Sequence, residues 1–277
     1  MRVFGLDFTS APSPRKPLVL ISCVLRPGAL EATAWEEIPG FEGFEAFLNS
    51  PGPWVCGMDF PFGQPRRLVA ALGWPPGWEG YVRAVSRLTK EEFEAALRAD
   101  MATRPPGSRH LYRQADRQAR SSSAMMLFRV PVGKMFYQGA PRLLASGVSV
   151  EPCRPTADPR VALEAYPALV ARRILGRARY KQDGGRDDPE RRSARERIVS
   201  ALEGCAGISA AYGLSVRVPP DLRERMILEP SADTLDSLLC ALQAGWACLR
   251  REDGWGIPQG CDRDEGWIVD PSMLEPT

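Results

Sequence analysis

Apolar residues gather in five short segments of the chain, and their spacing predicts five β-strands. The first three segments, 3–9, 18–25 and 30–37, are separated by turns that contain Pro, Ser and Gly. The fourth segment, 54–60, reads WVCGMDF and is apolar on both faces, so we expect it in the middle of a sheet. The fifth segment, 160–166, reads RVALEAY.

Helical spacing of apolar residues predicts helices between and after these strands. The helix at 90–102 has the clearest start signal, because Thr89 and Glu92 match a capping box. The last helix, 232–251, is expected to be amphipathic, with Leu235, Leu242 and Trp246 on its apolar face. The complete set of expected helices is 41–48, 90–102, 168–175, 189–203 and 232–251.

The remaining stretch, 61–155, is rich in Gly and Pro and reads as irregular apart from the helix at 90–102. We interpret it as a long, partly helical insertion after the fourth strand. The prediction is therefore a single α/β domain over residues 1–277, with a mixed five-stranded sheet flanked by helices. The ending DEGWIVDPS could add a further short strand.

Composition is ordinary for a globular protein of 277 residues, with 44% hydrophobic residues, 25% charged residues and a net charge of +2. The charge is unevenly distributed, however. Residues 101–142 hold eight basic residues against one acidic residue, and residues 171–197 hold ten against five. Such stretches can form an electrostatic footprint for phosphate groups. A solvated, arginine-rich surface would have the same composition.

The seven cysteines favour a reducing compartment, because they form no CxxC pair and several lie within apolar runs. The chain enters its first strand at once, without a charged and then apolar leader. The longest apolar run, near 18–25, is too short to span a bilayer. We therefore expect a soluble, cytoplasmic protein with no membrane partner.

Three carboxylates occupy similar places in the predicted strands. Asp7, Asp59 and Glu164 each follow an apolar run at or near a strand end. Ligands of open α/β sheets bind beside the carboxyl ends of the strands. Asp233 and Asp236 are three residues apart at the start of the last helix, so they project from one face. Together these residues form a candidate acidic site.

Each acid also has a plainer explanation. Asp7 and Asp59 could each pair with an arginine, and Asp233 could cap the helix or complement its dipole. Several crowded carboxylates, however, are unfavourable unless a cation neutralises them. Oxygen ligands of this type suit Mg²⁺ or Mn²⁺, and two such ions can hold the attacking water and the leaving oxygen of a phosphodiester.

Four phrases of the chain, GLDFTSAP, GMDFPFG, EAYPALVARRI and DTLDSLLCALQAGWA, resemble the predicted ribonuclease H-like nucleases grouped as domain of unknown function 429. The pattern of acids is similar to the Holliday-junction resolvase branch of the ribonuclease H-like superfamily. The resemblance implies a metal-dependent nuclease with Asp7, Asp59, Glu164 and Asp236 as catalytic residues. It also implies that Asp7, Asp59, Asp233 and Asp236 bind Mg²⁺ or Mn²⁺.

Nucleic acid is the partner that this interpretation requires. We expect Lys134, Lys181, Arg113 and Arg117 to hold its phosphates. His110, the single histidine, could act as a general base, although a surface role is the more common one for a loop histidine.

Two other functions fit parts of the sequence. A catalytically silent module could use the basic insertion to bind nucleic acid. The stretch GLDFTS also resembles the phosphate loop of actin-like sugar kinases, which would suggest a nucleotide-binding phosphotransferase. Those kinases need a second, glycine-rich copy of the motif, and the sequence from residue 164 onward carries none.

Overall fold

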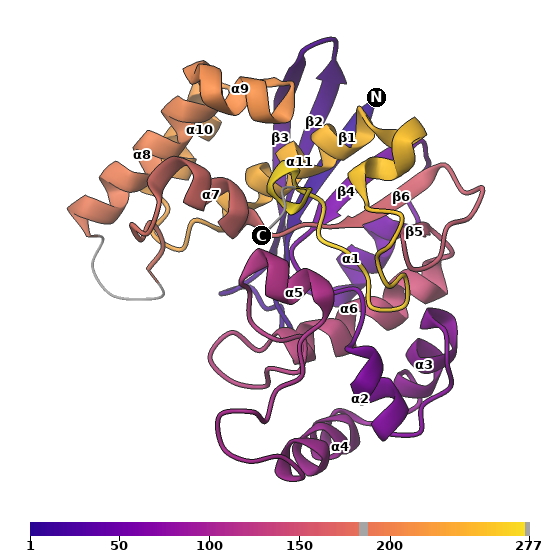
Figure 1. The fold of residues 1–277 in the computed structure, drawn as a ribbon. Helices are drawn as coiled ribbons and strands as arrows, with labels where there is room; N and C mark the ends of the chain where they lie inside the picture. The colour runs from indigo at the N-terminus through magenta and orange to yellow at the C-terminus, as the bar shows by residue number, and fades with distance from the viewer. Residues whose placement is uncertain (183–187, 275–277) are drawn as a thin grey trace.

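The computed structural model of the chain describes residues 1–182 and 188–274, which contain one mixed β-sheet. Its seven strands are β1 (Arg2–Asp7), β2 (Leu18–Arg26), β3 (Ala29–Ile38), β4 (Trp54–Met58), β5 (Ser149–Glu151), β6 (Arg160–Glu164) and β7 (Ser215–Arg217). The spatial order is β5-β6-β4-β1-β2-β3-β7 (Figure 1). Strands β1, β2 and β3 form an antiparallel meander, and the other neighbours pair in parallel. The predicted α/β class is confirmed.

The predicted count of five strands is wrong, because β5 and β7 extend the sheet at its two edges. Each of these strands has three residues, which is too few to show an alternating pattern in the sequence. The C-terminal segment does not add a strand. Instead, Ile268 forms an isolated parallel bridge with Glu164 beside β6.

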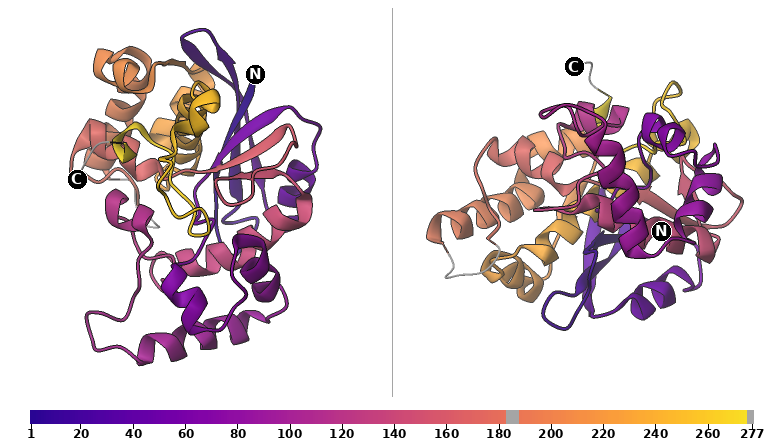
Figure 2. Two further views of the ribbon diagram at one scale, coloured as in Figure 1. Left: turned by 45° about the vertical axis from the view of Figure 1, so that its right-hand side comes forward. Right: turned by 90° about the horizontal axis from the view of Figure 1, so that it is seen from below.

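Helices cover both faces of the sheet (Figures 1 and 2). One face packs against α7, α8, α9, α10 and α11, and the other against α1, α2, α3, α4 and α6. None of the described helices has the length and apolar character that crossing a membrane requires. The helices are α1 (Phe41–Leu48), α2 (Arg66–Ala71), α3 (Trp78–Val85), α4 (Lys90–Ala102), α5 (Gln114–Ala119), α6 (Val132–Ser146), α7 (Pro167–Leu175), α8 (Pro189–Gly204), α9 (Ala206–Tyr212), α10 (Pro220–Leu228) and α11 (Asp233–Cys248), with short 3₁₀ turns at Arg251–Gly256 and Pro271–Met273.

The segment after β4 is more regular than we predicted. It contains five helices, α2 to α6, whereas we predicted a single helix there. Helix α6 was missed because Gly133, Gly139 and Pro141 interrupt its sequence pattern. Helix α4 and its capping box are confirmed, with the Glu92 N–H donating to Thr89 Oγ1 at 3.2 Å. Buried residues of α2, α3, α4 and α6 belong to the same hydrophobic cluster as Leu6 of β1 and Cys56 of β4, whereas α5 belongs to a small separate cluster.

Helix α11 was expected to be amphipathic, and this expectation is wrong. Every residue from Thr234 to Cys248 is buried. The helix packs against β1 and β4 on one side, while the residues that follow it pack back onto Trp246. Leu249, which falls inside the predicted range 232–251, lies just beyond the observed helix and is 48% exposed. A helix that is buried on all sides belongs to the core, and this one forms its centre.

Two glycines allow α11 to approach the sheet at backbone distance. A Cβ atom on Gly5 of β1 would collide with the carbonyl oxygen of Ser237, and one on Gly57 of β4 would collide with that of Cys240. Both obstacles are backbone atoms, which cannot rotate away. The absence of side chains at Gly5 and Gly57 therefore fixes how closely α11 lies over β1 and β4.

Gly57→Ala should lower the free energy of unfolding by roughly 1–3 kcal/mol, because α11 must move away from β4 to make room for the methyl group. Urea denaturation would measure the change. Gly204→Ala is the matched control, since Gly204 ends α8 with open space around it. The control should leave stability unchanged or raise it by up to about 1 kcal/mol. Equal stability of both variants would contradict the close packing of α11.

Candidate functional site

Three carboxylates converge at one end of the sheet. Asp7, Asp59 and Asp236 each contribute an oxygen atom, and these atoms all lie within 4.8 Å of one another. Asp7 ends β1 and Asp59 directly follows β4, and the Asp59 N–H donates to the Leu6 carbonyl at 3.0 Å. Asp236 lies in the first turn of α11. This is the arrangement of acids that can hold a divalent cation.

The register of the strands explains why Asp7 and Asp59 meet. Leu6 and Met58 are paired neighbours in the parallel ladder, so the residues that follow them lie side by side. Asp7 comes two residues after Gly5, and Asp59 comes two residues after Gly57. Because side chains on a strand alternate between faces, both aspartates face the side on which the glycines contact α11.

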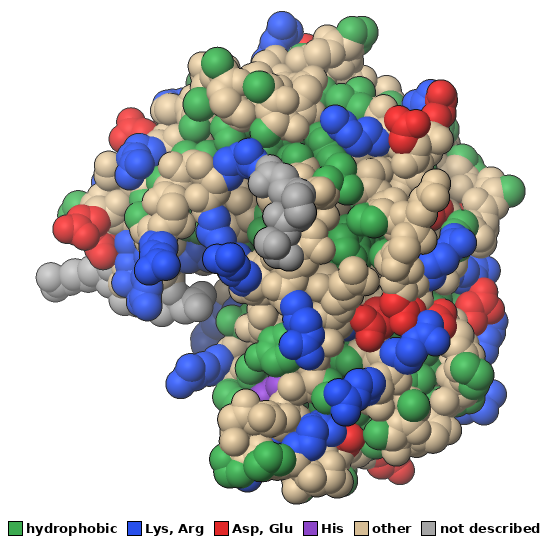
Figure 3. All heavy atoms as spheres, viewed as in Figure 1, with side chains coloured by type: hydrophobic (Ala, Val, Ile, Leu, Met, Phe, Trp, Pro, Cys, Tyr) green, Lys and Arg blue, Asp and Glu red, His purple; other side chains and the backbone are tan. Residues whose placement is uncertain are grey.

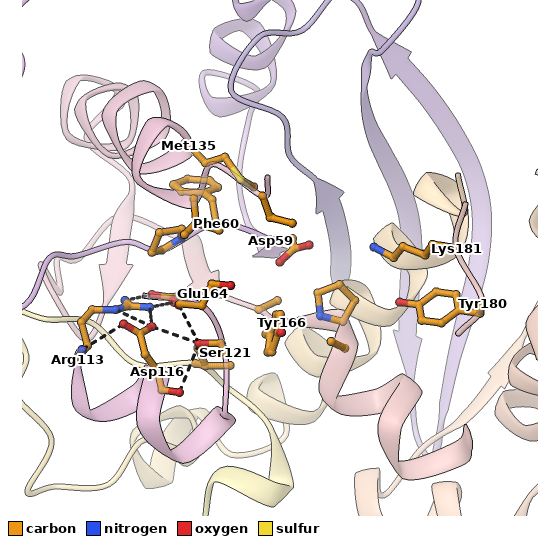
Figure 4. Close-up of a pocket in the computed structure, with 18 residues that line it drawn as sticks. Asp59, Phe60, Arg113, Asp116, Ser121, Met135, Glu164, Tyr166, Tyr180 and Lys181 are labelled. Carbon is orange, nitrogen blue, oxygen red and sulfur yellow. Dashed lines mark hydrogen bonds and ion pairs between the residues drawn. The ribbon is translucent and has the colours of Figure 1, made fainter. Parts of the chain in front are cut away.

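Tyr180 and Lys181 complete this site from the segment after α7. The Tyr180 hydroxyl donates to Asp236 Oδ1 at 2.7 Å, and the Lys181 ammonium forms an ion pair with Asp236 Oδ2. Figure 4 shows Lys181 directed toward Asp59 across the cavity. Asp236 is fully buried, whereas 41% of the Lys181 side chain is exposed. The carboxylates therefore share one cation that also reaches solvent.

Burial makes the ionised cluster costly. Burial raises the pKa of Asp7 well above its ordinary value, the charge of Asp233 adds to the increase, and Lys181 opposes it. Burial likewise raises the pKa of Asp59 to about 6, against the effect of Lys181 and with a further contribution from Glu164. When these groups ionise, they place negative charge where a compensating cation is favoured.

Glu164 does not join the cluster, because both of its oxygens are engaged by other groups. Arg113 donates to Oε1 at 2.6 Å and to Oε2 at 2.8 Å, and the Phe62 N–H donates to Oε2 at 2.9 Å. Figure 4 shows this network with Asp116 at the opposite end of the cavity from Lys181. A catalytic role for Glu164 does not fit this placement.

Arg113 is buried as well, so it cannot serve as the predicted contact to substrate phosphate. Burial alone would lower its pKa, but Asp116 and Glu164 more than compensate and hold the pKa of Arg113 well above its ordinary value. Its guanidinium also donates to Asp116 Oδ1 at 2.7 Å and to the Glu265 carbonyl at 3.0 Å. Arg113 thus joins three chain segments as a structural residue.

The other predicted residues lie at varying distances from the cluster. Asp233 is outside the three converging carboxylates and acts on Asp7 through its charge. Lys134 pairs with Glu94 of α4, with Nζ 3.1 Å from Oε1, and does not line the cavity. Arg117 is exposed, with its guanidinium 5.6 Å from the centre of the Tyr112 ring.

His110 also lies away from the lining of the cavity. It lies in the segment between α4 and α5, and its ring centre is 6.2 Å from that of Phe128. Burial and the charge of Arg104 lower the pKa of His110. The imidazole is therefore neutral near pH 7, in a place that does not suit a base acting at the carboxylate cluster.

Two hollows adjoin the cluster. A cavity of about 290 Å³ is lined by Asp59, Glu164 and Lys181 together with apolar side chains. A second hollow of about 710 Å³, which we call the basic groove, shares Tyr180 and Lys181 with the first. The two stretches that supply the basic groove were already indicated in the sequence by their excess of basic residues. Our choice of phosphate-binding residues nevertheless missed the arginines of the groove. They are Arg120, Arg172, Arg177 and Arg179.

The comparisons with known proteins identify the family. The model of the family described as a protein of unknown function, DUF429, matches residues 20–258. The chain belongs to the DUF429 family. The resemblance noted in the sequence is thereby confirmed at the level of the family. No curated protein and no solved structure matches the chain. The matched range of this DUF429 protein includes Asp59, Lys181 and Asp236, whereas Asp7 lies before it.

Asp59→Asn should stabilise the DUF429 protein without divalent cations. A raised pKa means that the folded chain binds the proton more tightly than the unfolded chain. The ionised form of Asp59 therefore costs stability above about pH 6, and this cost disappears as the pH falls toward 3.8. We expect a gain on the order of 2 kcal/mol at pH 8, shrinking as the pH falls below 6.

Urea denaturation in EDTA between pH 5 and pH 8 would measure this difference. The exposed Asp253 provides a control, and Asp253→Asn should change stability by less than about 0.5 kcal/mol. A loss of stability in Asp59→Asn at pH 8 would mean that the Asp59 carboxylate is well compensated in the folded chain.

Proposed function

We propose that this DUF429 protein is a divalent-metal-dependent nuclease, which hydrolyses phosphodiester bonds in nucleic acid. The observation that carries the proposal is the convergence of the Asp7, Asp59 and Asp236 carboxylates within 4.8 Å. The three residues come from two strand ends and a late helix, and each belongs to a different segment of the chain. A structural role alone gives no reason to bring together three acids, one of them fully buried and two partly buried.

The fold supports the same proposal. An antiparallel meander, a helix, a parallel fourth strand and a late helix that carries an acid also describe the ribonuclease H-like superfamily. In that superfamily the metal-binding acids occupy the first strand, the fourth strand and a late helix. Asp7, Asp59 and Asp236 occupy these three places, so we infer that the DUF429 protein has a ribonuclease H-like fold.

The charges of the site suit Mg²⁺ or Mn²⁺. Three ionised aspartates and the Lys181 ammonium sum to a charge of −2, which one divalent ion neutralises. Asp236 Oδ2 is buried and its described partner is the Lys181 ammonium, whose partly exposed side chain can share this oxygen with a metal ion. We therefore infer one metal ion, with Lys181 providing the additional positive charge, and not the two ions expected from the sequence.

Each residue then has a defined role. Asp7, Asp59 and Asp236 hold the ion through carboxylate oxygens, and the hydroxyl of Tyr180 fixes the orientation of Asp236. When bound, the ion supplies Lewis-acid polarisation of a phosphoryl oxygen and lowers the pKa of a coordinated water. Lys181 lines the cavity with a partly exposed side chain, so its ammonium can contact a phosphate oxygen of the substrate.

Fluorescently labelled DNA and RNA strands provide the test of activity. Cleavage should require Mg²⁺ or Mn²⁺ and should stop in EDTA. Asp7→Asn and Asp236→Asn should each lower the rate by about 100-fold or more, because each removes a metal ligand. Asp233→Asn is the matched control and should retain the rate within about tenfold, since Asp233 lies outside the converging set.

Wild-type cleavage rates in both Asp7→Asn and Asp236→Asn would contradict the assignment. Nucleic-acid binding without cleavage in any divalent metal would favour the non-catalytic module instead. A shift in thermal stability on addition of ATP would favour the phosphotransferase.

Isothermal titration calorimetry with Mn²⁺ should give one bound ion per chain at pH 8. Asp236→Asn should abolish this binding, because Asp236 is the buried member of the three carboxylates. Asp158→Asn is the control, since Asp158 pairs with Arg160 at the far end of β6. A stoichiometry of two would contradict the charge balance that favours a single ion.

A further inference from the structure

The basic groove lies beside the cluster, between the end of α5, one side of α7 and the segment after α7. Arg120 follows α5, Arg172 belongs to α7, and Arg177 and Arg179 follow α7. Figure 3 shows Lys and Arg side chains gathered around a hollow on the left of the molecule. The two locally basic stretches of the sequence thus meet in one groove.

Three of these arginines have no acidic partner. The side chains of Arg120, Arg177 and Arg179 are exposed. Within residues 1–182 and 188–274, these side chains form no ion pair and donate no hydrogen bond. Arg172, by contrast, donates to the Ala119 carbonyl at 2.7 Å and to the Tyr166 hydroxyl at 3.0 Å. Elsewhere many arginines pair with carboxylates, as Arg26 does with Glu31. The positive charge of the groove is therefore available to an anionic ligand.

The groove leads to the carboxylate cluster. Ala168, Tyr180 and Lys181 line both the groove and the smaller cavity, and Lys181 also contacts Asp236. A chain of phosphates that follows the arginines therefore arrives beside the three aspartates. The groove and the cluster form one continuous surface.

The cavity on the other side of Lys181 has a different character. Phe60, Tyr166, Val130 and Met135 are among the side chains that form its walls. Aromatic and apolar walls suit the planar face of an unpaired base, whereas the bases of a duplex are stacked inside the helix. Repeating phosphates in the groove and a base in the cavity are both features of a single strand. An acidic peptide would match the groove but offers no comparable group for the cavity.

We propose that the basic groove binds the sugar-phosphate backbone of single-stranded nucleic acid, with Arg120, Arg177 and Arg179 on its phosphates and an unpaired base in the cavity. This inference rests on the proposed nuclease function, for which it names the substrate class. It replaces Arg113 and Lys134 as phosphate contacts, because both have partners within the protein.

Fluorescence anisotropy with a fluorescein-labelled single-stranded oligonucleotide, in EDTA, tests the groove independently of cleavage. The double variant Arg177→Ala/Arg179→Ala should weaken binding on the order of tenfold near 0.1 M salt. For this variant, the slope of log K against the logarithm of the salt concentration should become shallower by about 1.4, which is about 0.7 for each lost phosphate contact. The matched control is Arg67→Ala/Arg87→Ala, two exposed arginines outside the groove, which should bind as the wild type does.

Unchanged affinity and salt slope in the groove variant would overturn the proposal. Tighter binding of the duplex form, or displacement of the strand by polyglutamate at equal charge concentration, would also overturn it. The two proposals fail separately. Asp7→Asn should bind the strand in EDTA without cleaving it when metal is added. Loss of binding confined to the groove variant, with no cleavage by any form of the protein, would uphold the groove and overturn the nuclease.

Discussion

The close contact between α11 and the two central strands determines the rest of the site. Gly5 and Gly57 leave no side chain between the sheet and the helix, so the backbone of α11 lies directly on β1 and β4. Asp236 in its first turn is thereby brought to the ends of these strands, where Asp7 and Asp59 face the same side. The sheet and the buried helix form a rigid frame that holds three carboxylates together.

This frame brings like charges together in a poorly solvated place, and the protein compensates them unequally. Glu164 is fully engaged by Arg113, and that network lies at one end of the cavity as part of the structure. The three aspartates share only Lys181 among the described cations that contact them. Their remaining negative charge is the physical reason for proposing a metal ion, and the neighbouring arginines are the reason for proposing an anionic substrate.

Much of this architecture could be predicted from the sequence, for reasons that particular residues illustrate. The strand that ends at Asp7 and the capping box at Thr89 are local signals, and both are present in the structure. Strands of three residues and the glycine-interrupted α6 carry too little pattern to be recognised. The ion pairs were harder to predict, because nothing in the sequence tells which arginine lies near which acidic residue. Arg113 was therefore assigned to substrate, although it pairs with Glu164 in the interior. The glycine two residues before each of Asp7 and Asp59 was the signal for the approach of α11, and it was overlooked.

A crystal structure of the protein with Mn²⁺, with anomalous diffraction data, would test the central claim most directly. The account predicts one anomalous peak coordinated by carboxylate oxygens of Asp7, Asp59 and Asp236. An anomalous map without a peak at these residues, in a crystal where Lys181 alone neutralises the three carboxylates, would contradict it.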